Sequence, residues 1–224
     1  GKWALVGPRF QPVLVDRNYR GKSEERLLLP SRSLAQRHDG PAGVKQVLRA
    51  GSRIAVTRNG QTVLDDEERR AAELVADAYI MFLLGSHYFN RSGATFALAG
   101  HSQVDGRRCD DILVVLKPGF GAAAEDRVVL SVDQKDKLLR RVRLTLNGLE
   151  STRGAEVDVT FSDFERHYGV LWPRGFDERI RSPFDLSAHR WRLVGLDVNR
   201  GLRAADLSIS GFRGKAETPA KPLP

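Results

Sequence analysis

The sequence has 224 residues, 41% of them hydrophobic, which is enough for the core of one large domain and excludes a disordered chain. Its formal net charge of +8 favours anionic partners such as phospholipid head groups, acidic proteins or nucleic acid. The single cysteine, Cys109, excludes an intrachain disulfide, and no apolar segment approaches the ~20 residues that span a bilayer.

The N-terminal part of the chain shows extended patterns interrupted by turns. Short apolar segments lie within residues 3–29 between prolines and Gly21, and residues 44–64 read as strands. Their turns are expected at Gly51 and at Asn59-Gly60, the latter being a strong hairpin signal. The sequence begins at Gly1 with neither methionine nor a signal peptide, so we expect any leader or anchoring segment to have been removed.

One amphipathic helix is predicted between Asp65 and Gly85. Either Asp65 or Asp66 can cap it, and acidic residues follow where the helix dipole favours them. Apolar residues recur at helical spacing, and the last turn is apolar on every side, which indicates that this end is enclosed or touches something apolar. Gly85 suits the C-terminal stop.

The remaining chain is expected to continue as an antiparallel meander. Strands are predicted at 95–98 and 112–116, and a hairpin turns at 133–136. Alternation over 155–161 indicates a strand with one dry and one wet face. A turn is expected at Tyr168-Gly169, and residues 190–198 and 207–209 are expected to close the sheet.

No pattern points to catalysis or to a metal. The five histidines are scattered without metal-ligand spacing, and no serine lies in a nucleophile elbow. A hairpin could bring His101 near Cys109 as a thiol–base pair, with Arg107 and Arg108 lowering the thiol pKa. Turn and strand roles are favoured for these residues, so no catalytic residue, metal or cofactor is assigned.

The basic segment 137–143 is the best candidate for nucleic-acid contact. Arg141 and Arg143 share one face of the expected strand and Arg140 the other, but no exposed aromatic residues are interleaved for base stacking. We therefore interpret the arginines as solvated residues that protect the strands, and we expect no nucleic-acid partner.

Three passages resemble the LolA/LolB-type lipoprotein-carrier superfamily and related outer-membrane lipoprotein-sorting proteins. They are the turn VDGRRCDDIL beginning at Val104, the hairpin VDQKDKLLRR beginning at Val132, and the segment FSDFERHYGVLWP beginning at Phe161. The resemblance covers mainly residues 95–212, and its motifs are structural rather than catalytic. The N-terminal helix usual in that family is not evident before Trp3.

The resemblance implies a mainly β (α+β) domain: a strongly curved, unclosed antiparallel half-barrel with a helix over its concave face. It implies an apolar cavity for the acyl chains of lipid or acylated lipoprotein, in the bacterial periplasm or at the periphery of the outer membrane. We expect a single domain over residues 1–213 and a flexible tail over 214–224. Periodicity, rather than the resemblance, selects the candidate lipid-binding residues, namely Tyr79, Phe82, Leu83, Val157, Val159 and Phe161.

Two functions remain open. The first is a non-enzymatic envelope protein that binds or carries acyl chains, with basic residues meeting an anionic membrane surface. The second is a structural or interaction module of the envelope, with a core filled by its own side chains and a basic surface that docks a protein partner. Sequence alone does not separate a filled core from an open cavity.

Overall fold

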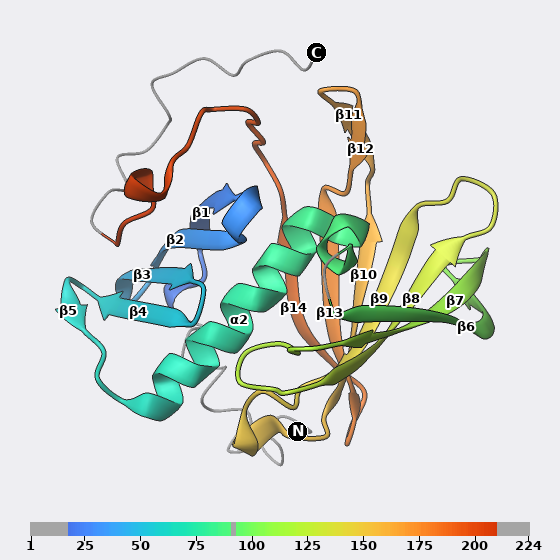
Figure 1. Cartoon of the computed structure of the whole chain (residues 1–224), viewed down its shortest axis with the longest axis horizontal. Helices are drawn as coiled ribbons and strands as arrows, with labels where there is room; N and C mark the ends of the chain where they lie inside the picture. Colours follow the sequence, from blue (N-terminus) through green and yellow to red (C-terminus); the bar gives the residue numbers. More distant parts are fainter. Residues whose placement is uncertain (1–17, 91–92, 210–224) are drawn as a thin grey trace. The chain divides into compact units, whose positions relative to one another are not determined.

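The computed structural model describes residues 18–90 and 93–209, which form two compact units. Residues 18–80 and 197–209 belong to the five-stranded unit, and the described part of 81–196 forms the seven-stranded unit. The described chain is mainly antiparallel β-sheet with one long α-helix (Figure 1). The expected tail and the extended segments before residue 18 lie outside the described residues.

The five-stranded unit is a meander in which each strand pairs with the next along the chain. Arg49 forms ion pairs with Glu73 and Asp77 of the following helix, at 3.0 and 3.1 Å, and Arg58 pairs with Glu68 at 2.6 Å. These contacts hold the helix against the sheet. The elements are β1 (Lys22–Leu28), β2 (Ser33–Gly40), β3 (Gly43–Ala50), β4 (Arg53–Arg58), β5 (Gln61–Thr62), α2 (Asp66–Leu84) and 3₁₀ turns at Leu29–Ser31 and Ala204–Asp206.

The predicted helix is confirmed. Asp65 Oδ1 accepts a hydrogen bond of 2.8 Å from the Glu68 backbone N–H, which satisfies a donor that the first helical turn leaves free. The helix ends at Leu84, and Gly85 adopts a left-handed φ of 54°. The residues of α2 up to Ile80 belong to the five-stranded unit and those from Met81 to the seven-stranded unit.

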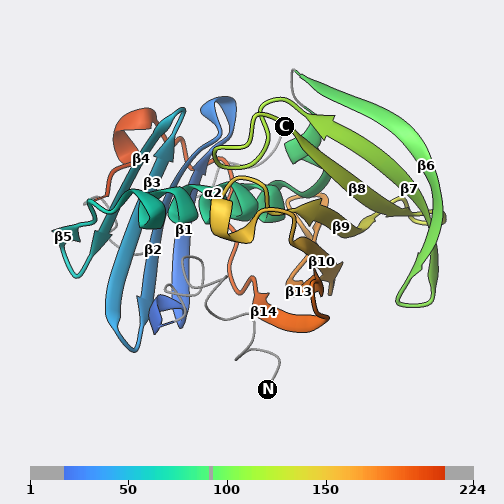
Figure 2. The same cartoon turned by 90° about the horizontal axis from the view of Figure 1, so that it is seen from below.

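The seven-stranded unit contains an open antiparallel sheet of order β14-β13-β10-β9-β8-β7-β6. Figure 2 shows this sheet curving from β14 at one edge to β6 at the other. Its strands are β6 (Ala94–Val104), β7 (Arg107–Leu116), β8 (Asp126–Asp133), β9 (Leu139–Thr145), β10 (Glu156–Ser162), β13 (Gly175–Ser182) and β14 (Leu186–Arg192). The hairpin β11 (Glu165–His167) and β12 (Val170–Trp172) and the 3₁₀ helices Gly85–Phe89 and Glu150–Thr152 complete the unit.

The predicted fold class and hairpin turns are confirmed. Tyr168 and Gly169 both have positive φ, as do Asn59 and Gly60, which is the geometry of two-residue hairpin turns. The described strands form two main sheets rather than one, and helix α2 lies between β5, the last strand of the first sheet, and β6, the first strand of the second.

The expected closing strand at 190–198 is confirmed only at residues 190–192, which belong to the edge strand β14, and the strand expected at 207–209 is wrong. β14 ends at Arg192, and the described chain after it contains only the 3₁₀ turn Ala204–Asp206. Asn199 and Gly201 have φ of 56° and 70°, so this segment cannot continue as an extended strand.

Candidate functional site

One face of the seven-stranded sheet is lined by apolar side chains. Val157, Val159 and Phe161 of β10 point to it together because side chains alternate along a strand, and each is at most 2% exposed. The strand register carries the same face onto neighbouring strands. Its other buried members include Val114, Leu116, Val128, Leu130, Val142, Leu144, Phe176 and Ile180. We call this surface the apolar face.

An aromatic cluster joins this face to the C-terminal turn of α2. Phe176 stacks on Trp191 with ring centroids 4.0 Å apart, and it meets Phe161 edge-on at 5.6 Å. Phe82 of α2 lies 5.3 Å from Trp191 and 6.1 Å from Phe176. The apolar end of the helix is therefore enclosed by the sheet, as its sequence indicated.

A second aromatic group follows the helix. Tyr88 of the 3₁₀ helix stacks on Phe120 at 5.4 Å and meets Phe89 edge-on at 5.3 Å. The Phe120 backbone N–H donates to the Asp126 carboxylate at 2.7 Å, which fixes this loop at the start of β8. All three rings are buried, and sequence analysis assigned no role to them.

The apolar face continues to the β6 edge of the sheet, where it becomes exposed. Phe96 pairs with Val114 and Leu98 with Ile112, so these side chains share the apolar face. Phe96 is 56% and Leu98 68% exposed, and Ile112 is half-buried. We call Phe96, Leu98 and Ile112 the edge patch.

The structure brings together most of the predicted lipid-binding residues. Phe82 and Phe161 meet through Phe176, and Val157 and Val159 lie on the same strand face as Phe161. Leu83 is half-buried in the turn that carries Phe82.

Tyr79 belongs to the five-stranded unit, where its ring meets His38 edge-on at 5.7 Å. The lining role of all six residues stays a prediction.

Sequence analysis missed Phe176, Trp191, Phe96 and Leu98. The sequence gives only a partial signal for the contact between Phe176 and Trp191, namely that both are aromatic residues on consecutive strands. Their meeting depends on a register shift between Glu178 and Arg179, which the sequence does not display.

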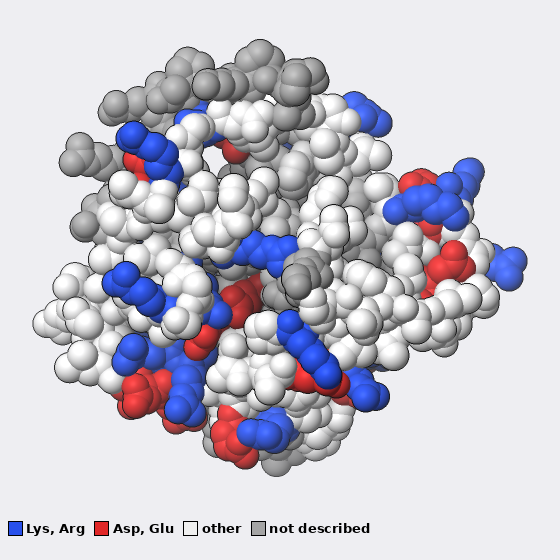
Figure 3. Space-filling view, viewed as in Figure 1, with Lys and Arg blue, Asp and Glu red and all other residues white. Residues whose placement is uncertain are grey.

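The opposite face of the sheet is polar, and its arginines are neutralised. Arg143 donates two hydrogen bonds to the Asp158 carboxylate, at 2.6 and 2.8 Å, and Arg141 donates to the Ser131 hydroxyl at 3.0 Å. The Asp158 interaction raises the pKa of Arg143. Figure 3 shows basic and acidic side chains side by side in small mixed groups.

Asp158 itself is only 7% exposed, so the face expected to be wet is covered there by arginine side chains.

A thiol–base pair between His101 and Cys109 is excluded by the strand register. His101 pairs with Asp110, and its Nδ1 lies 3.0 Å from Asp110 Oδ1, whereas Cys109 pairs with Ser102 on the other face. Burial, followed by the charges of Asp133 and Asp111, raises the pKa of the Cys109 thiol rather than lowering it. Among the described residues, no group of three or more His, Cys, Asp or Glu side chains could hold a metal.

The described chain is thus an open antiparallel β-sheet protein with a helix end packed on the apolar face of its larger sheet. Within 18–90 and 93–209, no helix has the length and apolar character needed to cross a membrane. Searches against protein-family models and curated proteins found no match.

Solved structures with a similar arrangement exist at low sequence identity. A LolA superfamily protein from Nitrosomonas europaea is 12% identical, with a TM-score of 0.48, over 88% of this chain and 96% of that one. A DUF1329 family protein from Desulfovibrio piger is 14% identical, also at 0.48, over 92% and 98%. An outer membrane lipoprotein-sorting domain from Vibrio parahaemolyticus is 6% identical, at 0.43, over 80% and 79%.

Proposed function

We propose that the protein is a non-enzymatic binder of acyl chains, from lipid or acylated lipoprotein, on the apolar face of the seven-stranded sheet. The observation that carries this proposal is the edge patch. A buried apolar face that continues into exposed Phe96 and Leu98 offers a surface of the kind that marks ligand or partner contact. The resemblance found in the sequence supports the same ligand class and an envelope location.

An acyl chain suits this apolar face because it can bind without polar contacts. Burial of each methylene contributes about 0.8 kcal/mol, so a long chain can bind through apolar area alone. In the proposed mode the chain meets the edge patch first. The deeper lining is then made by the five residues selected by periodicity that belong to the seven-stranded unit, namely Phe82, Leu83, Val157, Val159 and Phe161.

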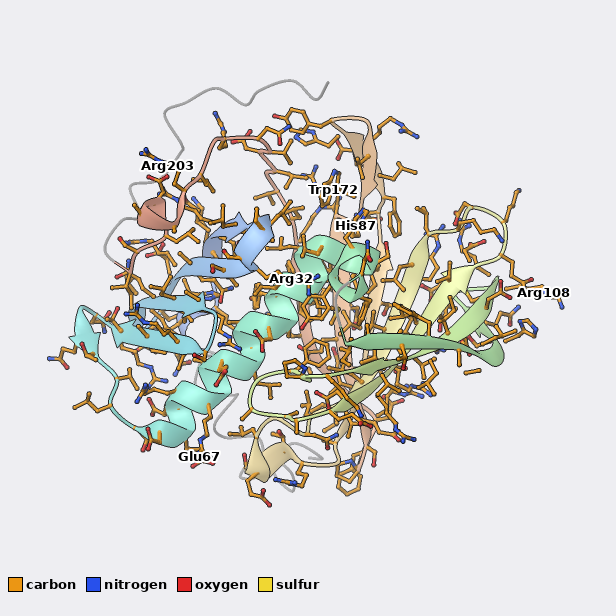
Figure 4. The ribbon with its side chains drawn as sticks, viewed as in Figure 1. Arg32, Glu67, His87, Arg108, Trp172 and Arg203 are labelled. Atoms are coloured by element: carbon orange, nitrogen blue, oxygen red, sulfur yellow. The ribbon has the colours of Figure 1, made fainter. Side chains whose placement is uncertain are left out.

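Basic residues at one end of the sheet suit an anionic head group or membrane surface. Arg108 is exposed at the start of β7, and Lys135 and Lys137 are exposed in the turn after β8. The Gln134 backbone N–H donates to the Arg108 carbonyl at 2.9 Å, which holds this turn beside the start of β7. Figure 4 shows Arg108 pointing away from the sheet.

The test combines native mass spectrometry of the gently extracted protein with titration of a fluorescent fatty acid. The double variant Phe96→Ser with Leu98→Ser is expected to weaken binding at least about tenfold, because each side chain loses apolar contact. Leu64→Ser is the matched control, since Leu64 is 81% exposed but lies outside the apolar face. A lipid-free mass together with no fatty-acid binding by the wild type contradicts the proposal.

A second function, a structural or interaction module of the envelope, is favoured by one observation. Phe82, Val157, Val159 and Phe161 are only 1–3% exposed, as in a core filled by its own side chains. The two functions differ in hydrogen exchange of the β10 amides. Added fatty acid slows this exchange if the chain binds beside β10, and it has no effect if the core is filled.

A further inference from the structure

The first half of the β6 edge, before the bulge at Leu98, lacks the charges and the short length that normally prevent strands from pairing with other chains. An edge strand presents unpaired N–H and C=O groups, and proteins protect it with charge or short length. β14 carries Arg190 and Arg192, β1 has the charged sequence KSEERLL, and β5, β11 and β12 have two or three residues each. Among the described strands, the segment Ala94–Leu98 of β6 is the long edge without a charge.

The hydrogen-bond pattern shows which groups of β6 face outward. Asp105 and Gly106 form a two-residue turn with positive φ, so Val104 and Arg107 are a hydrogen-bonded pair. Pairs of this kind alternate along an antiparallel ladder. Along β7 the alternation continues past the bulge between Leu98 and Gly100, because the extra residue of the bulge lies in β6. Past the other end of the strand, the Lys117 N–H donates to the Gly93 carbonyl at 3.2 Å, which agrees with this alternation.

The backbone groups of Ala94, Phe96 and Leu98 therefore point away from β7 and toward the open edge. Beyond Leu98 the bulge reverses the alternation, so the outward-facing stretch is limited to Ala94–Leu98. Phe96 and Leu98 add exposed apolar side chains to these backbone groups.

We propose that β6 pairs with β6 of a second copy of this chain, antiparallel about a two-fold axis at Phe96. In this register Phe96 lies opposite its own copy and Ala94 lies opposite Leu98, so every outward-facing group of the segment is used in about six main-chain hydrogen bonds. Thr95 lies opposite Ala97 in a non-hydrogen-bonded pair. The contact is small beside a standard interface of about 1,600 Å², so the dimer is weak and concentration-dependent.

A second copy fits this edge better than a charged peptide does. The chain carries a net charge of +8, but the paired segment has no charged residue, so the contact places no like charges opposite each other. A charged peptide gains no ion pair from Ala94–Leu98. The proposal goes beyond acyl-chain binding and does not depend on it, although the dimer places two apolar faces edge to edge.

The register is tested by disulfide cross-linking in a Cys109→Ser background, which leaves one thiol per chain. Chains with Thr95→Cys are mixed with chains with Ala97→Cys and oxidised. Directly opposite residues in this type of pair have Cα atoms about 4.5 Å apart, within disulfide range. A covalent dimer is expected in the mixture and not in either sample alone. Equal cross-linking in the single samples overturns the register.

The dimer itself is tested by sedimentation of the unmodified protein between about 10 µM and 1 mM, the range of weak association. The average mass is expected to rise above the 24.9 kDa of one chain. Phe96→Lys, which places like charges at the axis, is expected to keep the protein monomeric. The control Leu29→Lys changes a residue of similar exposure, 59%, outside β6 and is expected to dimerise like the wild type.

Ala94→Pro separates this proposal from acyl-chain binding. The Ala94 N–H faces outward, so proline removes no bond to β7 but obstructs a paired strand. This variant is expected to lose the dimer and retain fatty-acid binding, because Phe96 and Leu98 are unchanged. A wild type that stays monomeric at every concentration, or a dimer that survives both Phe96→Lys and Ala94→Pro, overturns the proposal.

Discussion

Glu25 lies on β1 opposite the buried side chain of Gln36. Burial raises the pKa of its carboxyl group, and hydrogen bonds with Ser23 and Gln36 offset only part of this effect. A carboxyl group whose pKa is higher in the folded than in the unfolded protein favours folding most below its unfolded pKa, about 4.3. That contribution is lost as the pH rises through the folded pKa.

Replacing Glu25 by Gln is therefore expected to favour the folded protein more at pH 7 than at pH 4. The amide cannot ionise, so it avoids the cost of a buried carboxylate at neutral pH. The measurement is the free energy of unfolding by urea at both pH values, for wild type and variant. All other titrating groups are shared, so the difference between the two proteins isolates Glu25.

Glu24→Gln serves as the control, because the Glu24 side chain is 38% exposed and points to the other face of β1. Its effect on the free energy of unfolding is expected to be small at both pH values. An unchanged difference between Glu25→Gln and wild type from pH 4 to pH 7 would contradict the burial argument.

At the scale of elements, the aromatic cluster holds α2 to the larger sheet through Phe176. This ring contacts Phe82, Phe161 and Trp191 and is 2% exposed. Phe176→Ala is expected to lower the free energy of unfolding by about 3–5 kcal/mol, because the cavity it leaves cannot close fully. Chemical denaturation followed by tryptophan fluorescence measures the change.

Two further variants serve as comparisons for the stability loss expected of Phe176→Ala. Phe176→Leu keeps most of the volume and is expected to cost less than Phe176→Ala. Phe184→Ala removes a ring that is 37% exposed in the turn between β13 and β14, and a change within about 0.5 kcal/mol is expected there. If Phe176→Ala and Phe184→Ala cost the same, the cluster does not hold the helix.

Local signals predicted individual elements well. Alternation over 155–161 correctly placed Val157, Val159 and Phe161 on one buried face, and the capping residue and Gly85 bounded α2. These features depend on neighbours in sequence, so the sequence displays them directly.

Features that depend on register were not predictable in the same way. Whether His101 and Cys109 share a face depends on how β6 pairs with β7, and the meeting of Phe176 with Trp191 depends on a bulge. A shift of one residue reverses every side chain of a strand, and the pattern of residues alone does not fix that shift.

At the scale of the whole molecule, α2 belongs to both compact units, changing from one to the other after Ile80. The predicted single domain over residues 1–213 implies that both units unfold together, since a helix that frays in one unit loses support in the other. Leu34→Ala in β2 is therefore expected to increase hydrogen exchange in β8 and β9 as well as in β2 and β3.

Phe176→Ala provides the reciprocal measurement, with exchange expected to rise in the five-stranded sheet. Leu34 is fully buried, so each variant removes a core side chain from a different unit. Exchange that rises only in the unit carrying the substitution would show two independent domains instead of one.

In the proposed dimer, the charges on β14 limit how far the assembly can grow. A sheet has two edges, and a dimer formed through β6 leaves β14 at both of its ends. Arg190 is held by Asp177 and Arg192 by Asp163, so each end carries fixed charges beside its backbone. In the proposed dimer these charged pairs oppose further strand addition at β14, so we expect the assembly to close at two copies. Loss of these charges would let β6 of one chain meet β14 of the next, a head-to-tail contact that repeats without limit into a fibre.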